Sequence, residues 1–110
     1  MYYLTLLFVI LFAAMAANAE DYTLTLKDHK FQPAELTIPS GQKVKITVKN
    51  LDVAPAEFES FDLNREKVVE GIQGGKPGSI DVYVGPLDPG KYDFFDDFHK
   101  ATTTGKLIVK

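Results

Sequence analysis

The stretch Pro39–Asn50, PSGQKVKITVKN, decides the fold that this sequence predicts. Its first three residues, Pro-Ser-Gly, are typical of a turn. Val44, Ile46 and Val48 then alternate with polar residues, mostly lysines. A period of two places these three side chains on one face of a β-strand, so this face is expected to be buried. The lysines opposite are typical of a solvated face, which also discourages edge-to-edge pairing.

Other short segments with strand character surround this one. The expected strands are Tyr22–Lys27, Glu35–Ile38, Ser79–Val84, Tyr92–Asp96 and Lys106–Lys110, and Val53–Ser60 is a loop or a further short strand. Phe61–Glu70 predicts about two helical turns with Asp62 as N-cap. Turn signals separate all of these segments, so we expect an all-β Greek-key β-sandwich of about seven strands with one short helical segment.

The N-terminal segment 1–19 is predicted to be a signal peptide. It is almost wholly apolar, and Ala17-Asn18-Ala19 is a small-x-small cleavage signal. The run is short for a membrane span, although an uncleaved anchor is the alternative. Cleavage would leave one domain, residues 20–110, in the periplasm and without membrane insertion.

The composition excludes several classes of function. The net charge is −3, so the chain lacks the excess of positive charge that is typical of nucleic-acid-binding proteins. It contains no cysteine, which excludes disulfides and all thiolate chemistry.

The stretch Tyr92–Gly105, YDFFDDFHKATTTG, carries the clearest functional residues. Alternation places Asp96 on the core side with two aromatic residues, and a carboxylate facing a core needs a partner. His99 follows three residues later, so the pair indicates a metal site or a proton-handling site. The alternative is that Asp96 only caps a turn and His99 is solvated. The second histidine, His29, is interpreted as a bend residue rather than a ligand.

The sequence resembles the cupredoxins, the fold of the small blue copper proteins. The similar segments are FQPAELTIPSGQKVKITVKNLD (31–52), PLDPGKYDFF (86–95), the histidine loop and GKLIV (105–109). Blue copper sites use two histidines and a cysteine. The resemblance places the position of the cysteine at Asp96, that of the second copper-binding histidine at His99, and that of the first copper-binding histidine at or near Ala56. Both methionines lie within residues 1–19. A type 1 blue copper site is therefore not expected.

The segments AEFES (56–60), Arg65-Glu66-Lys67 and FFDDFH (94–99) are similar to cupredoxin-like periplasmic proteins of bacterial iron uptake, of the FtrB and EfeO types. This resemblance implies a carboxylate-rich site for iron, copper or both, and partners that include a membrane iron permease and other periplasmic iron-uptake proteins. The expected metal ligands are Glu57, Glu59, Glu66, Asp96 and His99.

Parity places two further carboxylates, Asp93 and Asp97, outward as surface charge or as a second, weaker site. Ferrous oxidation is one activity that such a site would support, because hard oxygen ligands favour ferric iron. Two other classes remain open: a non-metal protein-interaction module on the same frame, and a hydrolase that uses paired carboxylates.

Overall fold

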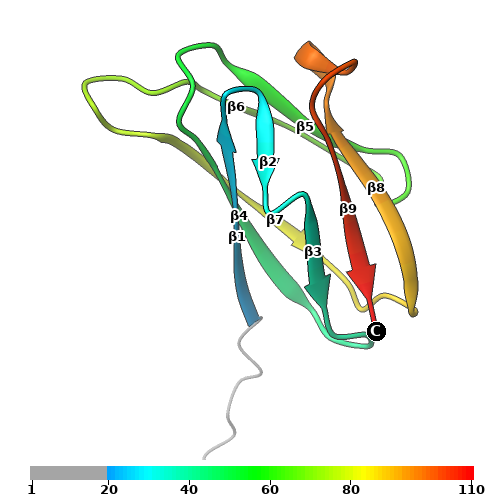
Figure 1. Cartoon of the computed structure of the whole chain (residues 1–110). Helices are drawn as coiled ribbons and strands as arrows, with labels where there is room; N and C mark the ends of the chain where they lie inside the picture. The colour runs from blue at the N-terminus through cyan, green and yellow to red at the C-terminus, as the bar shows by residue number, and fades with distance from the viewer. Residues whose placement is uncertain (1–19) are drawn as a thin grey trace, which may run out of the picture.

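The computed structural model describes residues 20–110, and the expected signal peptide lies outside the described residues. Two β-sheets pack face to face (Figure 1). The four-stranded sheet has the order β2-β1-β4-β7, from β2 (Lys30–Gln32), β1 (Glu20–Lys27), β4 (Val44–Asn50) and β7 (Gly78–Val84). The five-stranded sheet has the order β3-β9-β8-β5-β6, from β3 (Glu35–Ile38), β9 (Thr104–Val109), β8 (Gly90–Asp96), β5 (Ala56–Ser60) and β6 (Arg65–Val69).

This architecture confirms the predicted β-sandwich, with nine strands described where about seven were expected. The additional strands are the short β2 and the edge strand β6. β4 is central in its sheet, as its sequence predicts. It pairs in parallel with β1 and antiparallel with β7, and its three branched apolar side chains are at most 1% exposed.

The segment Phe61–Glu70 is not helical, so the prediction of about two helical turns there is wrong. The chain turns at Asn64, whose φ is 53°, and then enters β6, which pairs antiparallel with β5. The carboxylate of Asp62, expected to cap a helix, instead accepts the backbone N–H of Asp93 at 2.7 Å. Two isolated helical turns are too short to be stable, whereas pairing with β5 stabilises the segment as a strand. Within residues 20–110 the one helical element is the 3-10 turn η1, Asp97–His99.

Side chains of β6 also cover the exposed edge of the opposite sheet. Arg65 Nε donates to the carbonyl of Tyr83 at 2.9 Å, and Lys67 Nζ donates to the carbonyl of Asp81 at 2.7 Å. Both carbonyls belong to the edge strand β7. The two cations therefore satisfy backbone groups that an open edge would offer to another chain.

An aromatic cluster fills the core beneath the end of the sandwich where η1 lies. Phe94 lies 4.9 Å from Phe31 and 5.3 Å from Phe58 between ring centroids. Gly105 pairs with Phe94 across β8 and β9, and a Cβ atom at this glycine would overlap the phenylalanine ring. The GKLIV motif therefore begins with glycine because the ring occupies the space of a side chain.

Residues 20–110 contain no helix that is long and apolar enough to cross a membrane. The β1–β2 turn and η1 lie at the end of the sandwich opposite the C-terminus (Figure 1). This end carries the site described next.

Candidate metal centre

Asp96 is the most deeply buried carboxylate at this end, with 1% of the residue exposed. Its Oδ1 accepts the backbone N–H of Glu57 at 2.9 Å and that of Phe98 at 3.0 Å. Its Oδ2 lies 2.7 Å from Nδ1 of His99. Three hydrogen bonds thus compensate for the burial of this charge, which would otherwise be costly. The alternation in the sequence predicted the inward orientation of Asp96 but not these partners.

The direct contact between Asp96 and His99 joins the two positions at which the cupredoxin resemblance places copper ligands. Asp96 is also the N-cap of η1, and this 3-10 turn brings His99 back over the end of β8. Ala56, at the position of the first copper-binding histidine, is buried and offers no ligand atom. Because Asp96 accepts hydrogen bonds at both oxygens, it holds β5, η1 and His99 in one arrangement.

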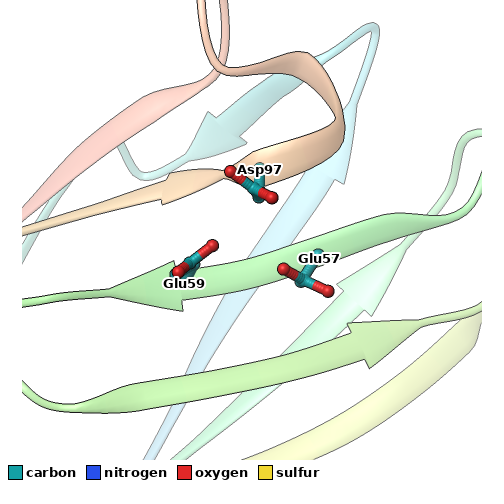
Figure 2. Close-up of side chains that lie close together, drawn as sticks. All are labelled: Glu57, Glu59 and Asp97. Carbon is teal, nitrogen blue, oxygen red and sulfur yellow. The ribbon is translucent and has the colours of Figure 1, made fainter.

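A separate group of carboxylates lies on the outer face of the five-stranded sheet. Oxygen atoms of Glu57, Glu59 and Asp97 lie within 4.8 Å of one another (Figure 2). Glu57 and Glu59 alternate along β5 with residues buried in the core, so both point outward. Asp97 begins η1 and extends toward them from the end of β8 (Figure 2). These three residues form what we call the carboxylate cluster.

The structure thus divides the expected ligand set into two groups. Glu57 and Glu59 belong to the carboxylate cluster, and both point away from the core. Glu66 lies directly opposite Glu59 in the β5–β6 register. Asp96 and His99 lie apart from the cluster, linked to it through the backbone N–H of Glu57.

Asp97 belongs to the carboxylate cluster but was not among the expected ligands. Its outward orientation was predicted from parity, and the residue is exposed. It was interpreted as surface charge or as part of a second, weaker site. The pattern AEFES contained the missing signal: Ala56, Phe58 and Ser60 are the buried residues, so both glutamates face out with Asp97.

Burial and the proximity of other acidic groups raise the pKa values of Glu57 and Glu59. Partial burial and then the neighbouring charges of Glu66, Asp97 and Glu59 raise the pKa of Glu57 to about 7. Partial burial, Asp97 and Glu66 also raise the pKa of Glu59, while a hydrogen bond with Glu57 and the charge of Lys100 act in the opposite direction. The cluster therefore holds negative charge that a bound cation would relieve.

These donors suit a hard cation. Carboxylate oxygens are preferred by Mg²⁺, Ca²⁺ and Mn²⁺ among divalent ions, and Cu²⁺ binds most N/O sites well because of its position in the affinity order. Three carboxylates also favour Fe³⁺ over Fe²⁺, because the higher charge gains more from each anionic ligand. The geometry fits an ion held by oxygen ligands, with water completing its coordination.

Fold and donor set together define a cupredoxin-like β-sandwich that has no thiolate for copper. Residues 1–109 match the family described as Cupredoxin-like domain, and the chain belongs to that family. It is 41% identical over 92 residues to the uncharacterized protein RP394 of Rickettsia prowazekii (strain Madrid E), with 84% of this chain and 70% of that protein covered. The family match confirms the resemblance seen in the sequence.

A second relative is named for iron uptake. The chain is 32% identical over 101 residues to the iron uptake system component EfeO of Yersinia pestis, covering 92% of this chain and 26% of EfeO. The chain therefore spans about a quarter of the length of EfeO. This distant homology agrees with the predicted EfeO-type resemblance.

Solved structures with the same fold include copper proteins. The metal-binding domain of the Cu(I)-exporting P-type ATPase CopA of Streptococcus pneumoniae D39 has a TM-score of 0.69 at 13% identity, with 82% of this chain and 84% of that chain covered. Amicyanin from Paracoccus versutus has a TM-score of 0.58 at 24% identity, with 86% and 83% covered. At these identities the similarity shows the fold alone.

Proposed function

We propose that this chain is an exported metal-binding protein that assists bacterial iron uptake, and that the carboxylate cluster is its iron site. The observation that carries the proposal is the convergence of Glu57, Glu59 and Asp97 from two elements to within 4.8 Å. Like charges at this separation repel one another, so the arrangement costs free energy unless a cation binds. The similarity to EfeO supports iron as the metal.

Each residue of the expected ligand set has a role in this proposal. Glu57, Glu59 and Asp97 bind the ion, and Glu66 supplies a fourth carboxylate on the neighbouring strand. Asp96 contacts the backbone of Glu57 and Phe98, so it positions both of the elements, β5 and η1, that carry the proposed ligands. His99 belongs to the same buried unit as Asp96.

The proposed location is the periplasm, where the predicted signal peptide would deliver the domain. Iron must then cross the membrane through a permease, so the proposed partners are a membrane iron permease and other periplasmic iron-uptake proteins. The open position of the cluster on a sheet face suits transfer of the ion between proteins. Preferential binding of Fe³⁺ would also promote oxidation of Fe²⁺ if a partner accepts the electron.

The alternative function is a protein-interaction module, and exposed apolar side chains favour it. Phe61 is 73% exposed, Phe98 is 49% exposed and Val68 is 45% exposed. Phe98 follows Asp97 directly, and Val68 pairs with Glu57 in the β5–β6 register. Phe98 and Val68 therefore lie beside residues of the carboxylate cluster, where a partner that receives the ion would dock.

The test of the role is iron uptake in the source organism at limiting ferrous iron. Deletion of the gene is expected to lower uptake, and complementation with Glu57→Gln/Asp97→Asn is expected not to restore it. Asp93→Asn, which changes an exposed carboxylate elsewhere on β8, is expected to restore it fully. If deletion leaves uptake unchanged while the permease is active, the iron-uptake role is wrong. If both variants restore uptake equally, the chain acts without the cluster and the interaction module is the better explanation.

A further inference from the structure

The two histidines of the chain contact each other. His29 and His99 are its only histidines, and the centroids of their rings lie 4.4 Å apart with an interplanar angle of 41°. They come from opposite ends of the domain sequence and meet at the loop end of the sandwich. Neither belongs to the carboxylate cluster, so the proposed iron site does not explain their contact.

The position of His29 is fixed by its backbone. His29 lies in the β1–β2 turn, where Asp28 and His29 have φ values of 52° and 56°. The backbone N–H groups of both residues donate to the carboxylate of Asp52, at 2.7 and 2.9 Å. The hydroxyl of Thr103, a fully buried side chain just before β9, donates to the carbonyl of His29 at 2.6 Å. The turn is thus held against the loop that carries His99.

Both imidazoles direct the same ring nitrogen toward a carboxylate. Nδ1 of His99 lies at hydrogen-bond distance, 2.7 Å, from Asp96 Oδ2, whereas Nδ1 of His29 lies 3.9 Å from Asp52 Oδ2, too far for a hydrogen bond. In the neutral ring of His99, a proton on Nδ1 that is donated to Asp96 leaves the lone pair on Nε2 free. The hydrogen bond to Asp96 fixes the orientation of the His99 ring, as carboxylates do for metal-binding histidines.

We propose that His29 and His99 form a second metal site, bound through their Nε2 atoms and selective for copper. At bond lengths of about 2.0 Å, two nitrogens on one ion lie at most ~4 Å apart. The ring centroids of His29 and His99 are 4.4 Å apart, so the two rings are close enough to contact one ion. The side chain of His29 is 49% exposed and that of His99 is 29% exposed, so an ion and its remaining water ligands have access.

Copper follows from the donors that the chain offers. Cu⁺ is a soft ion that prefers sulfur and accepts imidazole, whereas carboxylates suit hard ions. The sequence has no cysteine, and both methionines precede residue 20. Within residues 20–110 the two imidazoles are therefore the donors best suited to Cu⁺. This site is independent of the proposed iron site, because the carboxylate cluster lacks nitrogen and sulfur donors.

The test is anaerobic competition for Cu⁺ against a chromophoric chelator, with the purified domain of residues 20–110. The wild-type protein is expected to bind one Cu⁺ per chain, and His29→Asn and His99→Gln are each expected to weaken binding at least tenfold. Asparagine is chosen at position 29 because it tolerates the positive φ of this turn. The control Glu57→Gln/Glu59→Gln is expected to bind Cu⁺ as the wild type does.

Imidazole NMR signals provide a second readout that does not depend on one variant. The chain has two histidine ring signals to follow, and both are expected to shift together and to saturate at one equivalent of Cu⁺. The proposal is wrong if Cu⁺ fails to bind, if only one ring responds, or if His29→Asn binds with unchanged affinity. Loss of Cu⁺ binding in the carboxylate variant, with both histidine variants unaffected, would place copper in the cluster instead.

Discussion

Replacing Asp96 with alanine is expected to destabilise the domain strongly, although the residue lies beside a cluster of repelling charges. The substitution removes three hydrogen bonds to a buried carboxylate, from the backbone N–H groups of Glu57 and Phe98 and from His99. Hydrogen bonds to charged groups contribute about 1.5–3 kcal/mol each. The loss in Asp96→Ala is smaller than their sum, because the contributions are not additive and because alanine avoids the free-energy cost of burying a charge. We therefore expect a loss of about 3–5 kcal/mol, similar to breaking a buried ion pair.

The assay is equilibrium unfolding by urea and by heat, with metal-free protein at pH 7. For a domain of this size, about 1 kcal/mol shifts the Tm by roughly 4–8 °C, so Asp96→Ala should lower the Tm by at least ~12 °C. The matched control is Asp97→Ala, which removes the neighbouring carboxylate. Asp97 is exposed and adds to the repulsion on Glu57, so its removal is expected to be neutral or stabilising. A loss below about 1 kcal/mol for Asp96→Ala, or equal losses for both variants, would refute the positioning role of Asp96.

Three further predictions follow from the charges and ligands of this end of the sandwich. The pKa of Glu57 is raised from 4.5 to about 7, so between these pH values the folded state binds more protons than the unfolded state. The stability of the metal-free protein should therefore fall as the pH rises from about 4.5 through 7. In Glu57→Gln this fall should be smaller, and a pH profile of urea unfolding that is unchanged in this variant would contradict the raised pKa. In Asp96→Asn, an amide N–H directed at Nδ1 of His99 should move the ring proton to Nε2, which nitrogen chemical shifts of the histidine would detect; retention of the Nδ1–H tautomer would contradict the assigned hydrogen bond. Copper-loaded protein should be pale, because no cysteine is present; an intense blue absorption would contradict the exclusion of a type 1 site.

The fold was predictable because its strands carry an alternation of period two. Residues 44–48 repeat buried and partly exposed positions without interruption, and a one-residue slip would expose the whole apolar row. β6 was not predictable in the same way, since four of its five residues are exposed. An edge strand with no inward apolar row has no periodic signal, and Asp62 as a possible N-cap suggested a helix instead.

The candidate site was predictable only in part, because the sequence indicated where single side chains point but not which of them meet. The inward orientation of Asp96 followed from the pleat, and the structure places Glu57 and Glu59 on one face of β5. Which face carried the site depended on how η1 turns the chain after β8, and local sequence does not determine that turn. The contact between His29 and His99 was equally hidden, because it depends on the docking of two distant loops.

The measurement that tests the central claim most directly is the anaerobic binding of Fe²⁺ to the domain at pH 7.5, measured by equilibrium dialysis. The account predicts one bound iron per chain and a loss of affinity of at least tenfold in Glu57→Gln/Glu59→Gln/Asp97→Asn. The control Asp93→Asn, which alters a carboxylate paired with Lys106 outside the cluster, should bind as the wild type does. Equal binding by the triple variant and the wild type would contradict the assignment of the carboxylate cluster as the iron site.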